Sequence, residues 1–305
     1  MGAAQTYLFG LTKMNRRYIS ELPMSRLALW SRHMAWFALA TTLIAIFIVR
    51  SDFLEERFGL PTLGGALAFA GVAVLFAFAA FIVIWRDGLT GIGAALTGIF
   101  VSLALLAYPV YLGAKAYTLP RIYDITTDPI KWPEYEQLAR MRSRDTNPAI
   151  YAGLASAELQ RAAYPEIETL EHDASPRAAY NGALVVLTKR KWSVINKRPP
   201  DGRRDGIIEA VVRSPIMGFR DDVVVRIRPG GGGSLIDIRS SSRYGTFDFG
   251  SNAQRVRALI DDIDSAIVEE KPEPVAPIAT KKQQVPQKAP PPKTSQAPSQ
   301  APAKR

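Results

Sequence analysis

The residues best suited to chemistry lie in one short stretch, DIRSSSRYGTFDFGSNAQR, from Asp237 to Arg255. It combines guanidinium, hydroxyl, amide and carboxylate groups, and we expect it to lead from a strand into the N-terminus of a helix. A helix N-terminus offers unpaired backbone N–H groups and partial positive charge, which suit a phosphate or carboxylate such as a lipid headgroup. The candidate anion-binding or ligand-binding residues are Arg239, Ser240, Ser242, Arg243, Asp248, Asn252 and Arg255.

The same stretch also fits a structural role, and we give this alternative more weight. Here Asp248 caps the helix and pairs with Arg243, which leaves no group for a ligand, because buried charges are usually paired. Ser251 and Gln254 have the spacing of a capping box at the start of that helix.

A second polar group follows from alternation in the predicted strands. Residues two apart share a sheet face, which places Glu209, Arg213, Arg226 and Asp237 on the face opposite the apolar residues. The mixed signs favour a solvated face with cross-strand ion pairs, in which Glu209 pairs with Arg213 or Arg239. The alternative is a polar binding surface, and an acid/base couple of Glu209 and Asp237 would need a substrate pocket.

The composition excludes several kinds of site. The chain has no Cys, which rules out disulfides, thiolate catalysis and Cys-based metal sites. Its two histidines are too few for a His-rich metal site or a catalytic triad in the soluble part. The adjacent carboxylates Asp221 and Asp222 point to opposite faces if extended, so we predict a turn leading into a strand rather than a metal pair. We therefore predict no metal and no cofactor.

The positive charge is concentrated at the C-terminal end. The net charge is +10, and residues 271–305 hold seven Lys or Arg and one Glu, which gives +6. This tail also has nine Pro and no aromatic residue, so we predict a disordered, extended spacer that could touch anionic lipid or an envelope polymer. The folded part is only mildly basic, and we predict no nucleic-acid binding.

Three uncharged segments precede the soluble part, and we predict that they are transmembrane helices at about 33–50, 63–85 and 89–114 within a membrane part 33–115. Small residues at four-residue spacing in the third segment (Gly91, Ala95, Gly98 and Ser102) favour close helix packing. The two longer segments contain no ionisable residue, which favours an anchor over a transporter.

Lys and Arg near the segment ends predict the orientation. Residues 1–32 hold five Lys or Arg, whereas the loop after the first segment holds two Arg beside three acids. We expect a cytoplasmic N-terminal segment and, after three crossings, a periplasmic soluble domain and tail in a bacterial inner membrane.

Residues 119–270 read as one α+β domain with an antiparallel sheet covered by helices on one face. The alternation predicts strands over 192–197, 207–214, 222–228 and 235–242, and less clearly over 166–171. Helices are predicted over 176–190 and from Ser251 onward, with a short one within 133–142. The glycine run Gly230–Gly233 is predicted to be a hairpin connection, because a phosphate loop needs a strand-to-helix context.

The soluble part resembles a known family through four segments: DITTDP (124–129), QRAAYPEI (160–167), IIEAVVRSPIMGFRDDVVVRIRP (207–229) and DIRSSSRYGTFDFGSNAQRVRALI (237–260). They are similar to the domain of unknown function 1499 family over roughly residues 121–264. The resemblance implies no catalytic residues, but it does imply an export signal or membrane anchor, which agrees with the predicted orientation.

The sequence as a whole favours a membrane-anchored envelope protein whose domain binds or scaffolds a lipid, an envelope polymer or a protein partner. The alternative is a membrane-tethered hydrolase or transferase that uses carboxylates and the Arg/Ser cluster. An enclosed pocket lined by Glu209, Asp237 and Arg239 would favour the enzyme.

Overall fold

A computed structural model describes residues 22–51 and 58–269. Its first elements are three apolar helices: α1 (Arg26–Arg50), α2 (Gly59–Asp87) and α3 (Ile92–Lys115). Each is long and apolar enough to cross a membrane, as the sequence predicts. α1 begins upstream of the start expected at residue 33, because Ser25 caps it by accepting a hydrogen bond from the Ala28 N–H.

Small residues line the contacts among these helices. Gly98 of α3 lies so close to the Ser31 side chain of α1 that a Cβ atom on Gly98 would overlap it. The Ser31 hydroxyl in turn donates to the Ala73 carbonyl of α2 at 2.8 Å. Spacings of three and four residues separate the fully buried alanines of α2, which are Ala66, Ala70, Ala73, Ala77 and Ala80. The small-residue stripe therefore packs the helices together.

Two tight connections depend on glycine. Gly88 ends α2 with a φ of 63°, in the left-handed region. Gly231 and Gly232 have φ of 59° and 95° and join two antiparallel strands, the geometry of a two-residue hairpin turn. The glycine run is therefore the predicted hairpin connection and not a phosphate loop.

The rest of the described chain is an α+β domain built on a six-stranded antiparallel sheet. The strand order is β1-β6-β5-β4-β3, and β2 pairs with a different part of β6. The strands are β1 (Asp124–Thr126), β2 (Leu170–His172), β3 (Ser193–Arg198), β4 (Gly206–Arg213), β5 (Arg220–Gly230) and β6 (Gly233–Ser242). The helices are α4 (Gln137–Met141), α5 (Leu154–Ala163), α6 (Pro176–Lys189) and α7 (Ser251–Glu269).

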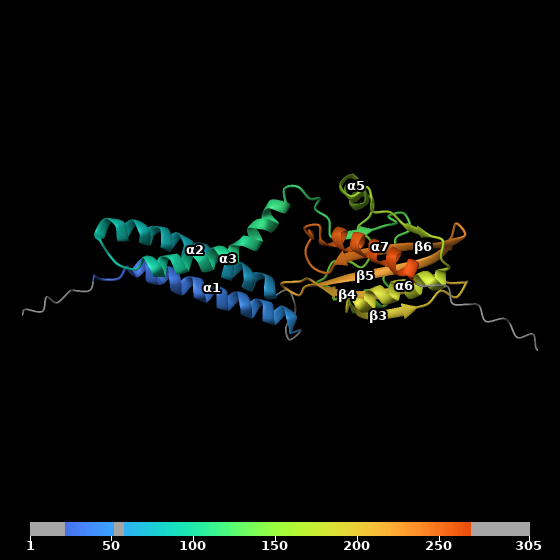
Figure 1. The fold of residues 1–305 in the computed structure, drawn as a ribbon, viewed down its shortest axis with the longest axis horizontal. Coiled ribbons are helices and arrows are strands. Elements are labelled where there is room, and N and C mark those ends of the chain that lie inside the picture. The colour runs from blue at the N-terminus through green and yellow to red at the C-terminus, as the bar shows by residue number, and fades with distance from the viewer. Residues whose placement is uncertain (1–21, 52–57, 270–305) are drawn as a thin grey trace, which may run out of the picture. The chain divides into compact units, whose positions relative to one another are not determined.

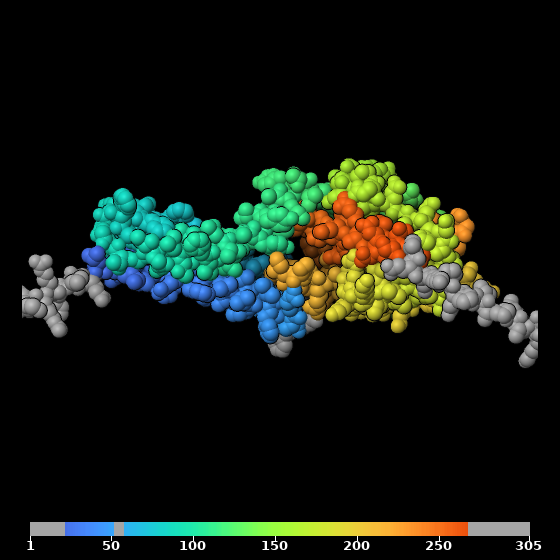
Figure 2. Space-filling model, in the orientation of Figure 1, coloured from blue at the N-terminus to red at the C-terminus, as the bar shows by residue number. Residues whose placement is uncertain are grey.

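Helices α6 and α7 cover one face of the sheet, as predicted (Figure 1), and their atoms lie side by side in the space-filling view (Figure 2). α6 starts with Ser175, whose hydroxyl accepts from the Ala178 N–H, and with Pro at its first position. The main core lies between this layer and the sheet, and its fully buried members include Val223, Val225, Ile236, Ile238, Leu259 and Ile263.

The opposite face of the sheet differs from the expectation of a solvated surface. The irregular segment 127–151, which includes α4, covers it through Tyr135 and Leu138, which pack on Ile207 and Val224. As a result Glu209, Asp237 and Arg239 are fully buried. Charges can be buried here because each is paired or hydrogen-bonded, as described next.

Candidate functional site

Arg239 is the largest fully buried side chain of the described residues. Its Nε and one terminal nitrogen donate to the two carboxylate oxygens of Asp124 at 3.0 and 2.7 Å. Further donations reach the carbonyls of Pro133 and Ala149. The guanidinium carbon lies 4.5 Å from the ring centre of Tyr135, a cation–π contact. The guanidinium of Arg239, which lies on β6, is therefore paired with β1 and hydrogen-bonded to segment 127–151.

Asp222 of β5 holds two more guanidiniums. One carboxylate oxygen accepts from Arg142 Nε at 2.8 Å, and the other accepts from Arg243 at 2.9 and 2.7 Å. Ser241 accepts a further hydrogen bond from Arg142 and contacts the Tyr135 hydroxyl at 3.0 Å. Asp222 itself is fully buried, so this cluster ties segment 127–151 to the sheet.

The start of α7 is also closed by internal hydrogen bonds. Asp248 accepts from the backbone N–H groups of Gly250 and Asn252, both at 2.8 Å. The Asn252 side chain bonds to Ser240 and Ser242. The helix starts at Ser251, so Asp248 supplies the cap in place of the predicted Ser251–Gln254 capping box.

The predicted anion-binding constellation is thus brought together, but each of its three arginines is already paired with a carboxylate: Arg239 with Asp124, Arg243 with Asp222 and Arg255 with Asp221. Arg255 donates to Ser240 and pairs with Asp221 at 2.6 Å. The expected pairing of Arg243 with Asp248 is wrong, because Arg243 bonds to Asp222 instead. The arrangement favours the structural alternative for this stretch.

The solvated-face interpretation expected Glu209 to pair with Arg213 or Arg239, and this expectation is wrong. Its two oxygens accept from the backbone N–H groups of Glu136 and Gln137 at 2.5 and 2.9 Å. It therefore holds the start of α4 against the sheet. Arg213 lies at the end of β4, opposite Arg220 of β5, outside this buried layer.

Asp237 is the fourth buried carboxylate of this face, after Asp124, Asp222 and Glu209. It accepts from Arg226 at 2.8 Å, from Arg228 at 2.9 Å and from Thr169 at 2.6 Å. Burial by itself raises the pKa of Asp237, but these hydrogen bonds outweigh it and hold the pKa below its usual value.

This pKa makes the domain's stability depend on pH. A carboxylate with a lowered folded-state pKa contributes stability that is complete above its unfolded pKa, about 3.9, and is lost as the pH falls through the folded-state pKa. We expect the unfolding temperature to fall below about pH 4, and Asp237→Asn to flatten part of that fall. Thermal unfolding of both proteins between pH 7 and pH 2 tests this, and parallel curves would contradict it.

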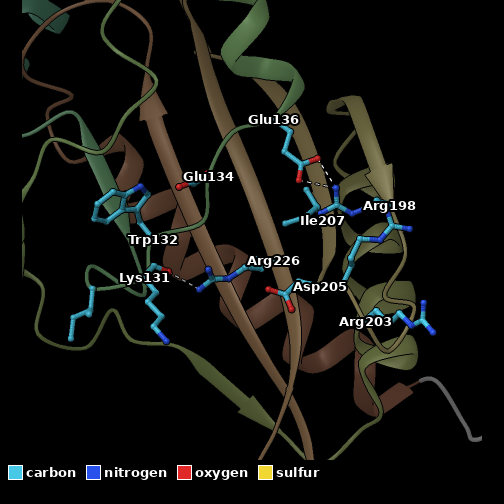
Figure 3. Close-up of a pocket in the computed structure, with 11 residues that line it drawn as sticks. Lys131, Trp132, Glu134, Glu136, Arg198, Arg203, Asp205, Ile207 and Arg226 are labelled. Carbon is cyan, nitrogen blue, oxygen red and sulfur yellow. Dashed lines mark hydrogen bonds and ion pairs between the residues drawn. The ribbon is translucent and has the colours of Figure 1, made fainter.

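An open groove of about 600 Å³ lies beside this buried layer, at the end of the sheet where β4 begins. Figure 3 shows its walls: one is the segment from Ile130 to Glu136, and the other is Arg198 on β3 with the loop 203–205. Arg226 of β5 and Ile207 of β4 form the floor between them. The volume is in the range of small-ligand sites.

The groove has an excess of positive charge. It is lined by five cations and three acids, which gives +2; the cations are Lys131, Arg198, Arg203, Arg204 and Arg226, and the acids are Glu134, Glu136 and Asp205. Three of the cations are already paired: Arg198 with Glu136, Arg204 with Asp201, and Arg226 with Asp237.

Lys131 and Arg203 differ from these three. Both side chains are exposed, and no hydrogen bond or ion pair of either is found within the described parts of the chain. Trp132 is half-buried next to Lys131 and stacks on Tyr151 with 5.4 Å between ring centres. The groove thus combines two available cations with a fixed aromatic ring.

None of the candidate residues singled out in the sequence lies in this groove except Arg226. Lys131, Trp132 and Arg203 were missed because they come from two irregular segments far apart in the chain. The only sequence signal was the pairing of aromatic and basic residues in IKWP and of basic residues in DGRRDG.

The described residues contain no group of three His, Asp or Glu side chains placed to hold a metal ion. His172 is used locally, since its Nδ1 accepts a hydrogen bond from the Ala174 N–H at 2.9 Å. Asp221 and Asp222 lie in strand β5 and bond to different arginines.

Comparison with known proteins places the soluble part in a family. A search of curated proteins gave no match. Residues 124–263, from β1 to within α7, match the family described as "Protein of unknown function (DUF1499)", as the resemblance implied. The part of the chain that matches this family therefore follows three apolar N-terminal helices.

Proposed function

We propose that this chain is a membrane-anchored binding protein whose soluble domain holds an anionic ligand in the groove between segment 130–136 and loop 203–205. The observation that carries the proposal is the presence of two exposed cations, Lys131 and Arg203, without a partner among the described residues. Trp132 and Ile130 beside them offer apolar contact to the same ligand.

Binding is favoured over catalysis, because the buried carboxylates are already bonded and the phenol of Tyr151 is neutral. Glu209 and Asp237 are fully buried and bonded to backbone N–H groups or to arginines, so neither is free to transfer a proton to a substrate. Burial raises the pKa of Tyr151 to about 12, which keeps it a neutral phenol. The groove is lined by none of Glu209, Asp237 and Arg239, whose presence around an enclosed pocket would favour the hydrolase or transferase alternative.

The ligand class follows from the cations and the open shape. Arg and Lys recognise phosphate and carboxylate, and Arg does so in a bidentate manner. An open groove suits a segment of a longer molecule. We therefore propose an anionic envelope polymer as the ligand, and we propose that the basic tail 271–305, which lies outside the described residues, adds attraction to the same polymer or to anionic lipid.

Removing both available cations should weaken binding roughly tenfold, because two exposed ionic contacts of about 0.7 kcal/mol each sum to the 1.4 kcal/mol of a tenfold change. We expect this for Lys131→Ala combined with Arg203→Ala in the full chain in detergent. Titration calorimetry with inorganic polyphosphate and with polygalacturonate separates phosphate from carboxylate recognition.

The matched control for this titration is Arg177→Ala combined with Lys189→Ala. It removes two exposed cations from α6, on the other side of the sheet. Equal affinity of wild type and control, with loss only in the groove variant, supports the proposal. Equal loss of affinity in both variants would show that binding depends only on the overall charge of the protein. No loss of affinity in the groove variant would exclude the groove as the binding site.

We also propose that the domain lies on the periplasmic side of a bacterial inner membrane, with the N-terminus in the cytoplasm. The excess of Lys and Arg before α1 supports this. An alkaline phosphatase fusion after Arg142 should be active, and a fluorescent protein that folds only in the cytoplasm should be dark at the same position. The reverse pattern would place the domain in the cytoplasm.

A further inference from the structure

The turn between β4 and β5 is apolar at its tip. Its sequence from Ser214 to Phe219 is SPIMGF. The turn is well formed: the Ser214 N–H donates to the Phe219 carbonyl at 2.8 Å, and Gly218 takes a φ of 81°. Ile216 at the tip is 43% exposed. The turn thus holds an apolar side chain, that of Ile216, outward at its tip.

Arginines and aromatic residues lie at the same end of the sheet as this turn. Arg213 and Arg220 face each other across the strands at its base. The loop between β6 and α7 lies at the same end of the sheet, because Asp221 pairs with Ser242. That loop brings a pair of stacked rings, Phe247 and Phe249, with 4.3 Å between their centres. Apolar tips with flanking aromatic and basic residues are typical of protein surfaces at a membrane–water interface.

The covalent link to the anchor enters the domain at this same end. α3 ends at Lys115, and β1 begins at Asp124, which pairs with Ser241. The intervening residues 116–123 span at most about 28 Å if fully extended, and turns shorten them, such as the bond from the Leu119 N–H to the Lys115 carbonyl. In addition, Arg50 at the end of α1 donates its Nε to the Ile216 carbonyl at 3.1 Å.

We propose that the Ser214–Phe219 turn inserts into the interfacial layer of the bilayer that holds the anchor, and so seats this end of the domain on the membrane. The occupant is the lipid bilayer itself: the exposed side chains of Pro215 and Ile216 lie at the glycerol and upper acyl-chain level, and Arg213 and Arg220 at the base of the turn lie at the level of the headgroups.

This seating also sets the direction in which the groove opens. The groove lies where β4 begins, at Gly206, and the turn follows Arg213 at the other end of that strand. Seven residues at about 3.3 Å each separate the two ends by roughly 23 Å. A domain seated by the turn therefore presents its groove to the aqueous side, to a ligand that comes from outside the bilayer.

The chain has no Cys, which allows a site-specific test. Ile216→Cys and, independently, Pro215→Cys are labelled with an environment-sensitive fluorophore in the full chain in liposomes of phosphatidylethanolamine and phosphatidylglycerol. The matched control is Val185→Cys, which is 59% exposed on α6. Lipids carrying a nitroxide near the headgroup report bilayer contact, and iodide reports contact with water.

We expect nitroxide lipids to quench the labels at 215 and 216, and iodide not to quench them. At position 185 we expect iodide to quench the label and nitroxide lipids not to quench it. Iodide quenching at 215 and 216 equal to that at 185 would overturn it. Quenching by neither reagent would place the turn against protein and would also overturn it. A thermal unfolding curve for each labelled chain establishes that it is folded, and either of the two turn positions suffices for the test.

Discussion

Replacing Arg239 with alanine should destabilise the soluble domain by about 3–5 kcal/mol. The substitution leaves the Asp124 carboxylate fully buried without its bidentate partner, and it removes the cation between the Tyr135 and Tyr151 rings. A loss of this size is a large part of the stability of a typical domain. Denaturant unfolding of the full chain in detergent, followed by tryptophan fluorescence, measures it.

Two further variants show whether the loss comes from the unpaired charge. Asp124→Leu combined with Arg239→Met replaces the pair with apolar groups of similar size, and we expect it to recover much of the loss, because buried ion pairs are often replaceable in this way. Arg204→Ala breaks an exposed pair with Asp201 and should have little effect on stability, because solvent screens such pairs. If Arg239→Ala lowered the free energy of unfolding as little as Arg204→Ala does, the claim that the buried Arg239–Asp124 pair stabilises the domain would be wrong.

Replacing Asp222 with alanine should have an effect of similar size, about 3–5 kcal/mol. Asp222 is the shared acceptor for Arg142 and Arg243, whose side chains are 4% and 6% exposed. Its loss leaves two buried guanidiniums without a carboxylate and frees segment 127–151 from the sheet. Hydrogen exchange of that segment should therefore rise together with the loss of stability.

The control for Asp222 is Asp262→Ala. Asp262 also binds an arginine, Arg190, but its side chain is 50% exposed, so its removal should cost less than about 1 kcal/mol. Unchanged hydrogen exchange of segment 127–151 in Asp222→Ala would show that this segment is held by other contacts.

The sequence predicts the regular part of the domain well. Strands β3 to β6 and helix α6 agree with their predicted ranges to within two residues, because alternation and the Ser-Pro helix start are local signals. The residues of each sheet face were also assigned correctly: Val223 and Val225 face the helices, and Glu209 and Asp237 lie on the other face.

The covering of the polar face was not predictable in the same way. Alternation tells which residues share a face but not what lies over that face. The covering segment 127–151 has no regular period, and its apolar contacts with the polar face are few, chiefly those of Tyr135 and Leu138. Helix α5 was missed for a related reason, since its buried face is formed by Ser156, Ala157 and Gln160, of which only Ala157 is apolar.

The groove was missed because it is assembled by the tertiary fold. Lys131 and Arg203 are 72 positions apart in the numbering, and each lies in a turn-rich stretch whose few basic residues do not by themselves indicate a site. The Arg/Ser stretch from Asp237 to Arg255 drew attention instead, because it concentrates polar groups. Those groups are concentrated there because they bond to one another.

Hydrogen exchange of the full chain in nanodiscs, with and without inorganic polyphosphate, tests the central claim most directly. Binding in the groove predicts slower exchange in segments 130–136 and 198–207 and no change over 240–255. Slower exchange confined to 240–255 would place the ligand at the start of α7 instead. No change in either region at saturating polyphosphate would contradict an anion-binding function for this domain.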